Sequence, residues 1–547
     1  MTASDSSLSG TAQTDRLQVD LLASGLLPPL PAAFLSGEAL DLLAPLGFSP
    51  GDLESPGSAG VDRRSLAAAL ATANASYGHP AGGRLATQLA DPATRVVVTG
   101  QQPGLFGGPL YTLTKAVAAT LWAERLQTSG VPAVAVFWVA TEDHDYREVA
   151  QGRFPTASGV LSVDLGDDPS PLLPVGMRTF GQSVTKILEE LKGAMPGERY
   201  TEWVEKLGTW YRPEARFGEA FCRLLVEILK DRCPLLLDSM LPAVKLAQQP
   251  WLERLASERE DVEQAFIARD RAIESRGFEL QVSPQRGASP LFVLHGRERR
   301  RIEWLDADRF ALRGREPFEE SIDWLLELIA ENPAAVSAGV MGRSALQDAI
   351  LGTTVLLLGP GEVSYMPQVA PVYDVLGISP PSVAIRPQAM VLSRHQAERF
   401  ETLDVTLADL LSSSFDIDGF LARGKGDDVV APVREAIRDQ LVRLKGAALG
   451  IDGDLAKPWE KTQQQVDKAL AAFSGRLTAT VARRDEIARS RLEDLLASSR
   501  PAGALQERII STAHFPGKFG SAFSDALFSQ LDLDPARLHL IIPGETS

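Results

Sequence analysis

The order of apolar and polar positions predicts alternating buried strands and helices in the first part of the chain. Val96-Val97-Val98 is β-branched and apolar on both faces, as in a strand buried on both sides of a parallel sheet. The run AVAVFWV, residues 133–139, predicts a second strand of this kind. Between them, apolar residues recur at helical spacing from Pro109 to Gln127. Strand, helix and strand with short connections form a βαβ unit, so we expect the two strands to be parallel.

The same pattern continues along the chain with further strands and helices. Apolar runs predict more buried strands at residues 233–238, 354–358 and 383–386. Helical periodicity is found over residues 63–88, 219–230, 241–275 and 344–351, with a turn just before residue 344. The segments FELQV, LFVLH and RIEW, between Gly277 and Trp304, predict a small antiparallel insertion.

From Leu392 onward the pattern changes, because glycine becomes sparse and charged residues are interleaved with apolar ones. Apolar stripes with a spacing near 3.5 residues, and a slip around Arg484, predict two long antiparallel helices joined near residues 450–453. Continuous to residue 496, the second helix would be ~60 Å long. The rest of the chain is too short to cover the apolar stripes of such a long arm. We therefore expect the arm to pack on a second copy and form a homodimer. The segment from Phe515 to Pro543 regains glycine, proline and aromatic residues, and we expect it to return to the core.

These changes predict a chain of four parts, since 547 residues are too many for a single core. Residues 1–60 form an N-terminal tail and arm, of which the polar residues 1–15 are expected to be disordered. Residues 61–390 form the core, with insertions at about 150–230 and 241–335. Residues 391–505 form the helical coiled-coil arm, and residues 506–547 form the returning segment. The predicted fold class is α/β.

Composition and charge argue against nucleic acid as a partner and against a membrane location. A net charge of −16 argues against broad electrostatic binding of nucleic acid, although a small anionic ligand needs only a local positive site. The two cysteines, Cys222 and Cys233, lie in apolar sequence and are expected to be packed core residues in a reducing cytoplasm. No apolar run reaches the ~18 residues of a membrane span, and the N-terminus has no apolar signal core. We therefore expect a cytoplasmic protein that is neither secreted nor inserted into a membrane.

The first candidate site is the glycine-rich loop after the strand at Val96. It runs from Gly100 to Gly108 and leads to Pro109, in the expected first turn of a helix. Such a loop can hold a nucleotide or substrate anion at the helix N-terminus. The alternative is a tight turn whose glycines serve packing, but two glutamines and four glycines are more than a turn needs. The candidate binding residues are Thr99, Gly100, Gln101, Gln102, Gly107, Gly108, Tyr111 and Lys115.

The second candidate site, Glu142-Asp143-His144-Asp145, follows the second strand. An amine that attacks an activated carboxyl group must be neutral, and a histidine or aspartate here can take its proton. We expect the neighbouring carboxylates to raise the pKa of His144 and to hold a substrate ammonium group. Asp143, His144 and Asp145 are therefore candidate catalytic residues, and Glu142 is a candidate binding residue. The alternatives are a solvated acidic turn and a metal site; we predict no metal, because the other histidines are scattered.

Two further groups lie near the predicted strand at 354–358. In the first group, Arg343 can bind a carboxylate through two hydrogen bonds, with Gln347 and Asp348 beside it; the alternative is a capping or interface role. The second group is the loop Gly359-Pro360-Gly361-Glu362 together with Tyr365. Here Glu362 can bind the hydroxyl pair of a ribose or sugar, and the alternative is another tight turn. The candidate binding residues are Arg343, Gln347, Asp348, Gly359, Gly361, Glu362 and Tyr365.

Three stretches carry a resemblance to a known family. They are TGQQPGLFGGPLYT (99–112) with Lys115 beyond it, FWVATEDHD (137–145), and the group made of Arg343, Gln347, Asp348, GPGE (359–362) and Tyr365. Together they resemble the cysteine-adding enzymes of bacillithiol biosynthesis, the BshC family, over essentially the whole chain. One local departure is Met341-Gly342-Arg343-Ser344, where the family more often has an apolar residue and proline beside the arginine.

The resemblance implies a Rossmann-like core similar to class I aminoacyl-tRNA synthetases, and a C-terminal coiled coil that makes a homodimer. It also implies a ligase that joins L-cysteine to the amine of glucosaminyl-malate in the last step of bacillithiol synthesis. The chain has no HIGH or KMSKS signature, so the energy source stays open, with ATP or ADP as the natural candidate. The alternative function is a non-catalytic nucleotide-binding assembly or sensor protein that recruits partners through the coiled coil.

Overall fold

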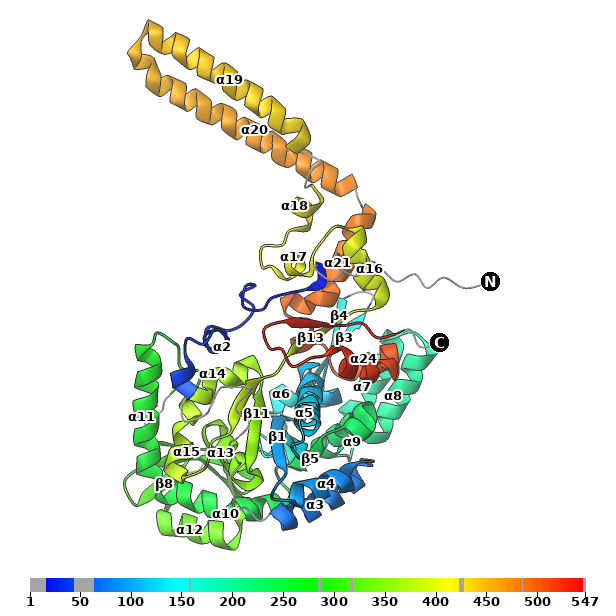
Figure 1. Cartoon of the computed structure of the whole chain (residues 1–547), viewed down its shortest axis with the longest axis vertical. Helices are drawn as coiled ribbons and strands as arrows, with labels where there is room; N and C mark the ends of the chain where they lie inside the picture. Colours follow the sequence, from blue (N-terminus) through cyan, green and yellow to red (C-terminus); the bar gives the residue numbers. More distant parts are fainter. Residues whose placement is uncertain are drawn as a thin grey trace. The chain divides into compact units, whose positions relative to one another are not determined.

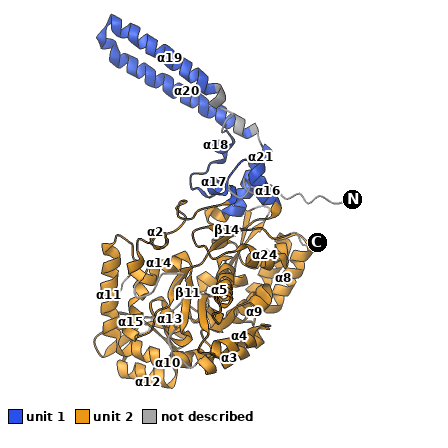
Figure 2. Cartoon of the chain, viewed as in Figure 1, with its two compact units in different colours: residues 1–17, 395–500 blue, residues 18–394, 501–547 orange. Residues whose placement is uncertain are grey.

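A computed structural model describes residues 16–43, 63–156, 159–283, 287–314, 318–422, 427–484 and 486–544. The chain divides into two compact units (Figure 2). The larger unit comprises residues 18–394 and 501–547, and the smaller one comprises residues 1–17 and 395–500. The tail predicted to be disordered, residues 1–15, lies outside the described residues. The larger unit therefore contains chain from both sides of the helical arm.

The larger unit is built around a parallel sheet with strand order β12-β11-β1-β2-β5 (Figure 1). The strands are β1 (Arg95–Gln101), β2 (Ala133–Val139), β5 (Leu235–Asp238), β11 (Thr353–Leu358) and β12 (Ser382–Ile385). All neighbouring pairs are parallel. Every residue of β2 and β11 is buried, as unbroken apolar runs predict for a sheet covered on both faces. The predicted α/β fold is confirmed, with α5 (Tyr111–Thr128) as the connection between β1 and β2.

Helices cover both faces of this sheet. Val98, Val136 and Leu237 belong to one hydrophobic core together with residues of α3 (Arg63–Ser76) and α10 (Pro242–Ser257). The alternate positions contribute to other cores; Phe137 and Leu236, for example, pack with α9 (Phe217–Leu229). Both cysteines are buried, as predicted. The remaining helices that matter for the site are α4 (Gly82–Ala90), α11 (Arg259–Ser275), α12 (Ile322–Glu331), α13 (Val340–Leu351) and α14 (Pro360–Val369).

A second, antiparallel sheet has the order β10-β6-β7-β8-β9. Its strands are β6 (Ala288–His295), β7 (Glu298–Trp304), β8 (Arg309–Leu312), β9 (Glu319–Ser321) and β10 (Val336–Ala338). The predicted antiparallel insertion is confirmed, but FELQV, residues 278–282, is not a strand. The side chain of Gln368 accepts hydrogen bonds from the backbone amides of Gln281 and Val282, at 3.1 and 3.0 Å. Those amides are therefore satisfied without a neighbouring strand.

Three predicted boundaries near the sheet edge are wrong. Helix α13 begins at Val340, so Arg343 lies in a helix and not in the turn before one. The residues after Gly359 form the first turn of α14 and not a loop, because Glu362 Oε2 accepts from the Gly359 amide at 2.7 Å and caps the helix. Helix α5 begins at Tyr111, because the residues before it pair with the C-terminal segment: Pro109 forms a β-bridge with Ser511, and the Leu110 amide donates to the Ile510 carbonyl oxygen at 2.9 Å.

The C-terminal segment packs on the core of the larger unit. It contains α22 (Gln506–Ile509), α23 (His514–Phe519), α24 (Ala522–Gln530) and β14 (Leu538–Ile541), and β14 pairs in parallel with β13 (Gln388–Val391). The Thr512 amide donates to the Gly108 carbonyl oxygen at 2.7 Å, and the Ala513 amide donates to that of Phe106 at 3.1 Å. This segment therefore covers the second half of the glycine-rich loop.

The smaller unit contains the predicted helix pair. Helices α19 (Asp427–Ile451) and α20 (Ala456–Arg484) contact each other and are joined through a short 3₁₀ turn, Gly453–Leu455. Helix α20 ends at the predicted slip, and α21 (Glu486–Ser499) follows it. The 29 residues of α20 span about 44 Å, which is less than the predicted length, because α20 does not continue to residue 496.

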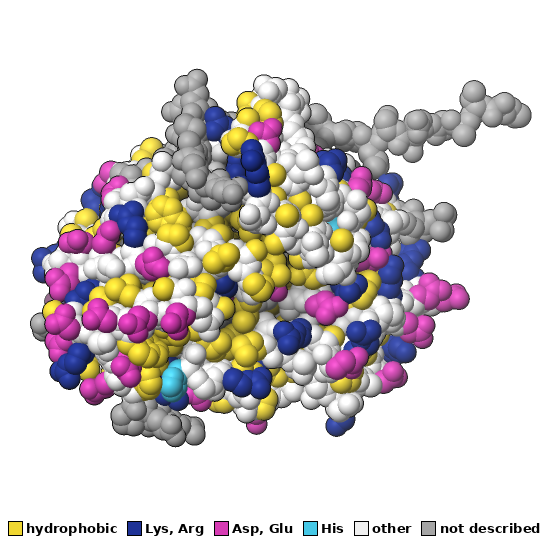
Figure 3. All heavy atoms as spheres, turned by 90° about the horizontal axis from the view of Figure 1, so that it is seen from below, with side chains coloured by type: hydrophobic (Ala, Val, Ile, Leu, Met, Phe, Trp, Pro, Cys, Tyr) yellow, Lys and Arg dark blue, Asp and Glu magenta, His cyan; other side chains and the backbone are white. Residues whose placement is uncertain are grey.

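Charge is mixed on the face of the molecule drawn in Figure 3. Acidic and basic side chains are interspersed there around exposed apolar ones. Among the described residues, none of the helices is both long and apolar enough to cross a membrane.

Candidate active site

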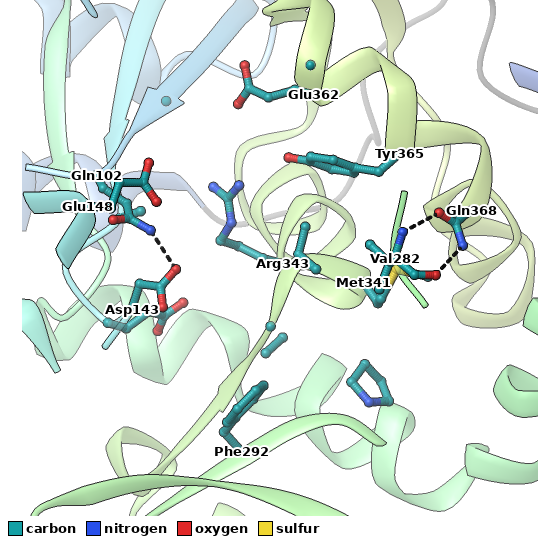
Figure 4. Close-up of a pocket in the computed structure, with 18 of the residues that line it drawn as sticks. Gln102, Asp143, Glu148, Val282, Phe292, Met341, Arg343, Glu362, Tyr365 and Gln368 are labelled. Carbon is teal, nitrogen blue, oxygen red and sulfur yellow. Dashed lines mark hydrogen bonds between the residues drawn. The ribbon is translucent and has the colours of Figure 1, made fainter. Parts of the chain in front are cut away.

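A cavity of about 1180 Å³ lies at the carboxyl edge of the parallel sheet (Figure 4). Its wall is formed by the segments that follow β1, β2 and β11, by the antiparallel sheet, and by α11, α13 and α14. Three segments that are far apart in the sequence, those after β1, β2 and β11, thus meet at one edge of the sheet. The predicted site residues that line the cavity are Gly100, Gln101, Gln102, Tyr111, Lys115, Glu142, Asp143, His144, Arg343, Gly359, Gly361, Glu362 and Tyr365.

Lys115 links two of these segments. Its Nζ donates to the Gly100 carbonyl oxygen and to Gln101 Oε1, both at 2.8 Å, and forms an ion pair with Glu362 Oε2 at 2.5 Å. The Lys115 side chain is only 3% exposed. Burial lowers the pKa of Lys115, and the carboxylate of Glu362 offsets part of that effect. The ammonium group therefore holds the start of the glycine-rich loop against the start of α14.

Asp143 links the glycine-rich loop to the segment after β2. Its Oδ2 accepts from Gln102 Nε2 at 2.8 Å, and its Oδ1 accepts from the His144 amide at 2.7 Å. The Arg299 guanidinium approaches Oδ1 to 3.6 Å. Burial alone would raise the pKa of Asp143, but Arg299 and the His144 amide outweigh it and hold the pKa below its usual value. Asp143 is therefore an anion at neutral pH, suited to holding an ammonium group.

His144 is neutral and has a defined tautomer. Arg299 Nη1 lies 3.1 Å from His144 Nδ1, and a guanidinium can only donate, so Nδ1 accepts and the ring proton is on Nε2. Burial and the Arg299 charge lower the pKa of His144. Asp143 and Asp145 act to raise this pKa, as expected, but burial and Arg299 outweigh them, so that the net shift is downward.

Arg299 itself is fixed by the antiparallel sheet. It lies on β7, its Nε donates to Ser337 Oγ at 2.9 Å, and its Nη2 donates to the Ala338 carbonyl oxygen at 3.0 Å. Its guanidinium carbon lies 3.9 Å from the centre of the Phe292 ring. Sequence reasoning missed Arg299, since the run RERRR (297–301) in a predicted strand is typical of a solvated face.

Arg343 projects from α13 into the cavity, toward the space between Asp143 and Glu362 (Figure 4). Burial raises the pKa of Tyr365, and the positive charge of Arg343 beside it opposes that shift. Within the described part of the chain no carboxylate forms an ion pair with it, whereas Lys115 and Arg299 each have one. The planar guanidinium is thus available for a ligand carboxylate.

Gln347 and Asp348, also predicted as site residues, lie behind Arg343 and do not line the cavity. Asp348 accepts from the Tyr373 hydroxyl at 2.5 Å and from Gln347 Nε2 at 3.1 Å. Burial raises the pKa of Asp348 to about 6. Both residues support the helix that carries Arg343.

Four other predicted residues lie outside the cavity. The Thr99 hydroxyl donates to the Leu357 carbonyl oxygen at 2.9 Å and ties β1 to β11. Asp145 is exposed and caps the short helix α6 (Tyr146–Val149). Gly107 and Gly108 are buried beneath the C-terminal segment. The second half of the loop is therefore not open to the cavity as a phosphate cradle, although Tyr111 at the start of α5 lines the cavity.

The site also contains ion pairs that the sequence did not indicate. Glu142 forms an ion pair with Lys245 of α10, and both side chains are buried. Arg386 forms a buried two-point ion pair with Glu507, with Nη1 to Oε2 at 2.9 Å and Nη2 to Oε1 at 2.8 Å. Among the residues that the structure describes, no group of three or more His, Cys, Asp or Glu residues is placed to hold a metal ion.

Apolar side chains gather at the far end of the cavity, among polar ones. This end is lined by side chains of α11, the 278–283 segment and α13, including Phe266, Ile267, Val282 and Met341 (Figure 4). Gln368 of α14 connects α11 to the 278–283 segment, because its Nε2 donates to Asp270 Oδ1 at 2.9 Å and to the Val282 carbonyl oxygen at 3.0 Å. The cavity therefore has its cluster of ion pairs at the sheet edge, and apolar side chains mixed with polar ones such as Asp270 and Gln368 at the other end.

Fold and site together define a class of proteins with a Rossmann-like α/β domain, a polar cavity at the carboxyl edge of its sheet, and a helical C-terminal domain. The family model described as "Bacillithiol biosynthesis BshC, N-terminal Rossmann-like domain" matches residues 52–387. The model of the "C-terminal coiled-coil domain" of the same family matches residues 389–542. The chain belongs to the BshC family.

Relatives that each bear the name "Putative cysteine ligase BshC" match most of the chain. The Salinibacter ruber protein is 29% identical over 87% of this chain and 88% of its own length. The proteins of Solibacter usitatus and Prosthecochloris aestuarii are 27% and 26% identical, over 82% and 84% of this chain and 84% of their own lengths.

Proposed function

We propose that this chain is a cysteine ligase of bacillithiol biosynthesis, which forms an amide bond between the carboxyl group of L-cysteine and the amine of glucosaminyl-malate. The observation that carries the proposal is one cavity with an ionised Asp143 and an ion-pair-free Arg343 on its wall. The substrates bring an amine and carboxylates into the same site, and these two side chains complement them. Family membership over both domains supports the same activity.

The polar end of the cavity suggests a role for each group. Asp143 holds the ammonium group of a substrate, and Arg343 binds a carboxylate through two hydrogen bonds. His144 presents its Nε2–H as a donor, suited to a carbonyl oxygen on which negative charge develops. Lys115 and Glu362 keep the two segments that frame this end together.

A free carboxylate and an amine do not condense unaided in water, so the cysteine must react as an activated acyl group, either an acyl phosphate or an acyl adenylate. We propose ATP as the source of that activation. The buried Gly107 and Gly108 do not fit the expected phosphate cradle, so we assign no protein group to a nucleotide phosphate.

We further propose that the chain is a homodimer that pairs through α19 and α20. Large apolar side chains on these helices and the turn between them are exposed, with Ile451 83% and Phe473 61% exposed. A second copy of the helix pair would bury them. Sedimentation analysis should show a dimer, and Phe473→Glu should weaken it; a wild-type monomer at micromolar concentration would contradict this proposal.

The test of the activity is turnover by the purified protein. L-cysteine, glucosaminyl-malate and ATP should yield the amide, detected by mass spectrometry, and omission of any one component should abolish it. If neither ATP nor a chemically prepared cysteinyl adenylate supports product formation, the ligase proposal is wrong and the non-catalytic alternative is favoured.

Arg343→Ala sharpens this test, with Arg343→Lys as its matched control. Loss of a charge-assisted two-point contact, about 1.5–3 kcal/mol, should raise the KM of the carboxylate substrate roughly 10- to 100-fold. The lysine variant should recover part of this loss, because it restores the charge without the planar fork. An unchanged KM in both variants would remove Arg343 from the binding site.

A further inference from the structure

Amide formation needs a group that takes a proton from the attacking ammonium, and this inference rests on the proposed ligase activity. A general base must face the cavity, and its acceptor atom must not already be held by a protein cation. The carboxylates that line the polar end of the cavity are Glu142, Asp143, Glu148 and Glu362. These four carboxylates differ in whether a protein cation forms an ion pair with them.

Three of these carboxylates are engaged by cations. Glu142 is paired with Lys245, and both are buried. Glu362 is paired with Lys115 and caps α14. Asp143 accepts hydrogen bonds on both oxygens and lies beside Arg299, which stabilises its charged form and makes it a weak base.

His144 is excluded by its tautomer. Its Nδ1 accepts from Arg299 Nη1 at 3.1 Å, so Nε2 already carries the ring proton. Protonation of Nδ1 would set an imidazolium against the guanidinium at this distance, which costs free energy. His144 can donate a hydrogen bond to a substrate, but it is not placed to accept a proton.

Glu148 remains. It lies on α6, directly after the strand-end cluster, and its side chain lines the cavity on the same side as Gln102 and Asp143 (Figure 4). Among the described residues, its carboxylate forms no ion pair, and its one side-chain hydrogen bond is a long contact, 3.5 Å, from Gln101 Nε2. We propose that Glu148 is the general base that deprotonates the amine before it attacks the activated cysteinyl group.

The surroundings of Glu148 suit this role. Glu148 is exposed, but the surrounding cavity wall removes part of its hydration; this desolvation and the carboxylates of Asp145 and Asp143 raise the pKa of Glu148 to about 7, with Lys115 opposing and Glu362 adding to the shift. A base whose pKa lies near the working pH is accessible as the carboxylate and still strong enough to accept a proton. The titratable and charged groups that face it are Asp143 and Asp145 beside its own helix, Tyr111 and Lys115 from α5, Glu362 and Tyr365 from α14, and Arg343 from α13.

Proton transfer to Glu148 is the first event of the proposed step. The substrate ammonium transfers one proton to the Glu148 carboxylate and becomes a neutral amine. The nitrogen lone pair forms a bond to the carbonyl carbon of the acyl phosphate or acyl adenylate. The carbon–oxygen bond to the phosphate breaks, and the phosphate oxygen leaves with that electron pair. The second amine proton goes to the departing phosphate or to water, and Glu148 returns its proton to solvent.

The test compares Glu148→Gln with the wild-type protein for two nucleophiles. With glucosaminyl-malate, E148Q should form amide about 100-fold or more slowly, and the acidic limb of the wild-type kcat profile, with its midpoint near pH 7, should disappear. With hydroxylamine, which is already neutral at pH 7, E148Q should form cysteinyl hydroxamate within about 3-fold of the wild-type rate. Glu148→Asp should retain part of the amide activity together with the acidic limb.

Glu327→Gln is the matched control, because Glu327 is exposed on α12 and does not line the cavity. It should leave both reactions unchanged. Wild-type amide turnover in E148Q, an unchanged acidic limb, or an equal loss of hydroxamate and amide in E148Q would overturn the assignment of Glu148 alone. Absence of both products from the wild-type protein would overturn the ligase activity, and this assignment with it.

Discussion

Two strand-to-helix junctions at the same edge of the parallel sheet look alike in sequence and differ in structure. The first follows β1 and contains Gly100–Gly108; the second follows β11 and contains Gly359–Gly361. In the first junction, residues 511–513 of the C-terminal segment cover the second half of the loop. The second junction opens into the cavity, and its own Glu362 caps the helix that follows it.

The glycines show what this difference means. Gly107 has φ +86°, and a Cβ atom there would lie 2.9 Å from Thr512 Cβ and 3.0 Å from Leu224 Cδ2. Gly361 has ordinary φ, and a Cβ atom there would have no other atom within 4 Å. Glycine is thus demanded by packing in the first junction, and in the second it leaves the helix start open to a ligand. A glycine count in the sequence does not separate these two uses.

Gly107→Ala and Gly361→Ala should show the largest difference between the two junctions in the free energy of unfolding. Positive φ costs a non-glycine residue ~1–2 kcal/mol and over-packing adds ~1–3, so Gly107→Ala should lower the free energy of unfolding by about 3 kcal/mol. Gly361→Ala should change it by less than about 1 kcal/mol. Chemical denaturation of the larger unit, followed by tryptophan fluorescence, measures both. Equal effects would show that the two junctions are packed alike.

Lys115→Met removes the link between the junctions and should have the next largest effect. Two oxygen acceptors and the Glu362 carboxylate lose their donor. Breaking a fully buried ion pair costs ~3–5 kcal/mol; Glu362 is 23% exposed and keeps some hydration, so we expect about 2 kcal/mol. Turnover should fall as well, because both segments frame the polar end of the cavity. A variant as stable as the wild type would show that the junctions are held together elsewhere.

Glu362→Gln should have a smaller effect that depends on pH. It should cost about 1.5 kcal/mol at pH 7, because the buried Lys115 loses its counter-charge. Without Glu362 the folded-state pKa of Lys115 falls further, so below its unfolded pKa of about 10.4 the unfolded chain binds more protons than the folded one. The free energy of unfolding therefore rises with pH, and the deficit of the variant should narrow between pH 7 and pH 9. Urea denaturation at both pH values tests the sign, and a widening deficit would contradict it.

Ser511→Ala should have the smallest effect and should touch the first junction alone. The buried Ser511 Oγ accepts from the Arg153 amide at 2.9 Å, and the variant leaves that amide without this acceptor. We expect a loss of about 1 kcal/mol in the free energy of unfolding, with unchanged kcat. A change in kcat larger than the change in stability would mean that the covered half of the loop takes part in turnover.

Local pattern predicted much of the fold. The apolar runs at 96–98, 133–139 and 354–358 were sufficient for β1, β2 and β11, because strands covered on both faces leave an unbroken signal. The 3.5-residue spacing of apolar side chains was sufficient to predict the helices α19 and α20. Since the carboxyl ends of parallel strands share one edge, the meeting of Gln101, His144 and Glu362 around one cavity could also be predicted.

The misses depend on contacts between distant parts of the chain. The pKa of His144 is lowered in part by Arg299, 155 residues away, which no local rule brings beside the acidic cluster. FELQV has strand propensity, but its amides are bound by the side chain of Gln368. Glu148 follows the recognisable cluster by three residues, and what distinguishes it is which neighbouring carboxylates are already paired. Propensity and spacing carry no such information.

The covering of Gly107 by Thr512 also affects how the protein is made. Residues 427–499, which build the long helices, are synthesised after the five parallel strands and before the residues that cover the glycine-rich loop. A nascent chain that still lacks residues 501–544 has all five parallel strands but neither β14 nor the cover of this loop. Arg508 of this segment lines the cavity, so the pocket is completed only after the helical arm has been synthesised, and chains cut short within that arm should have an unfinished pocket.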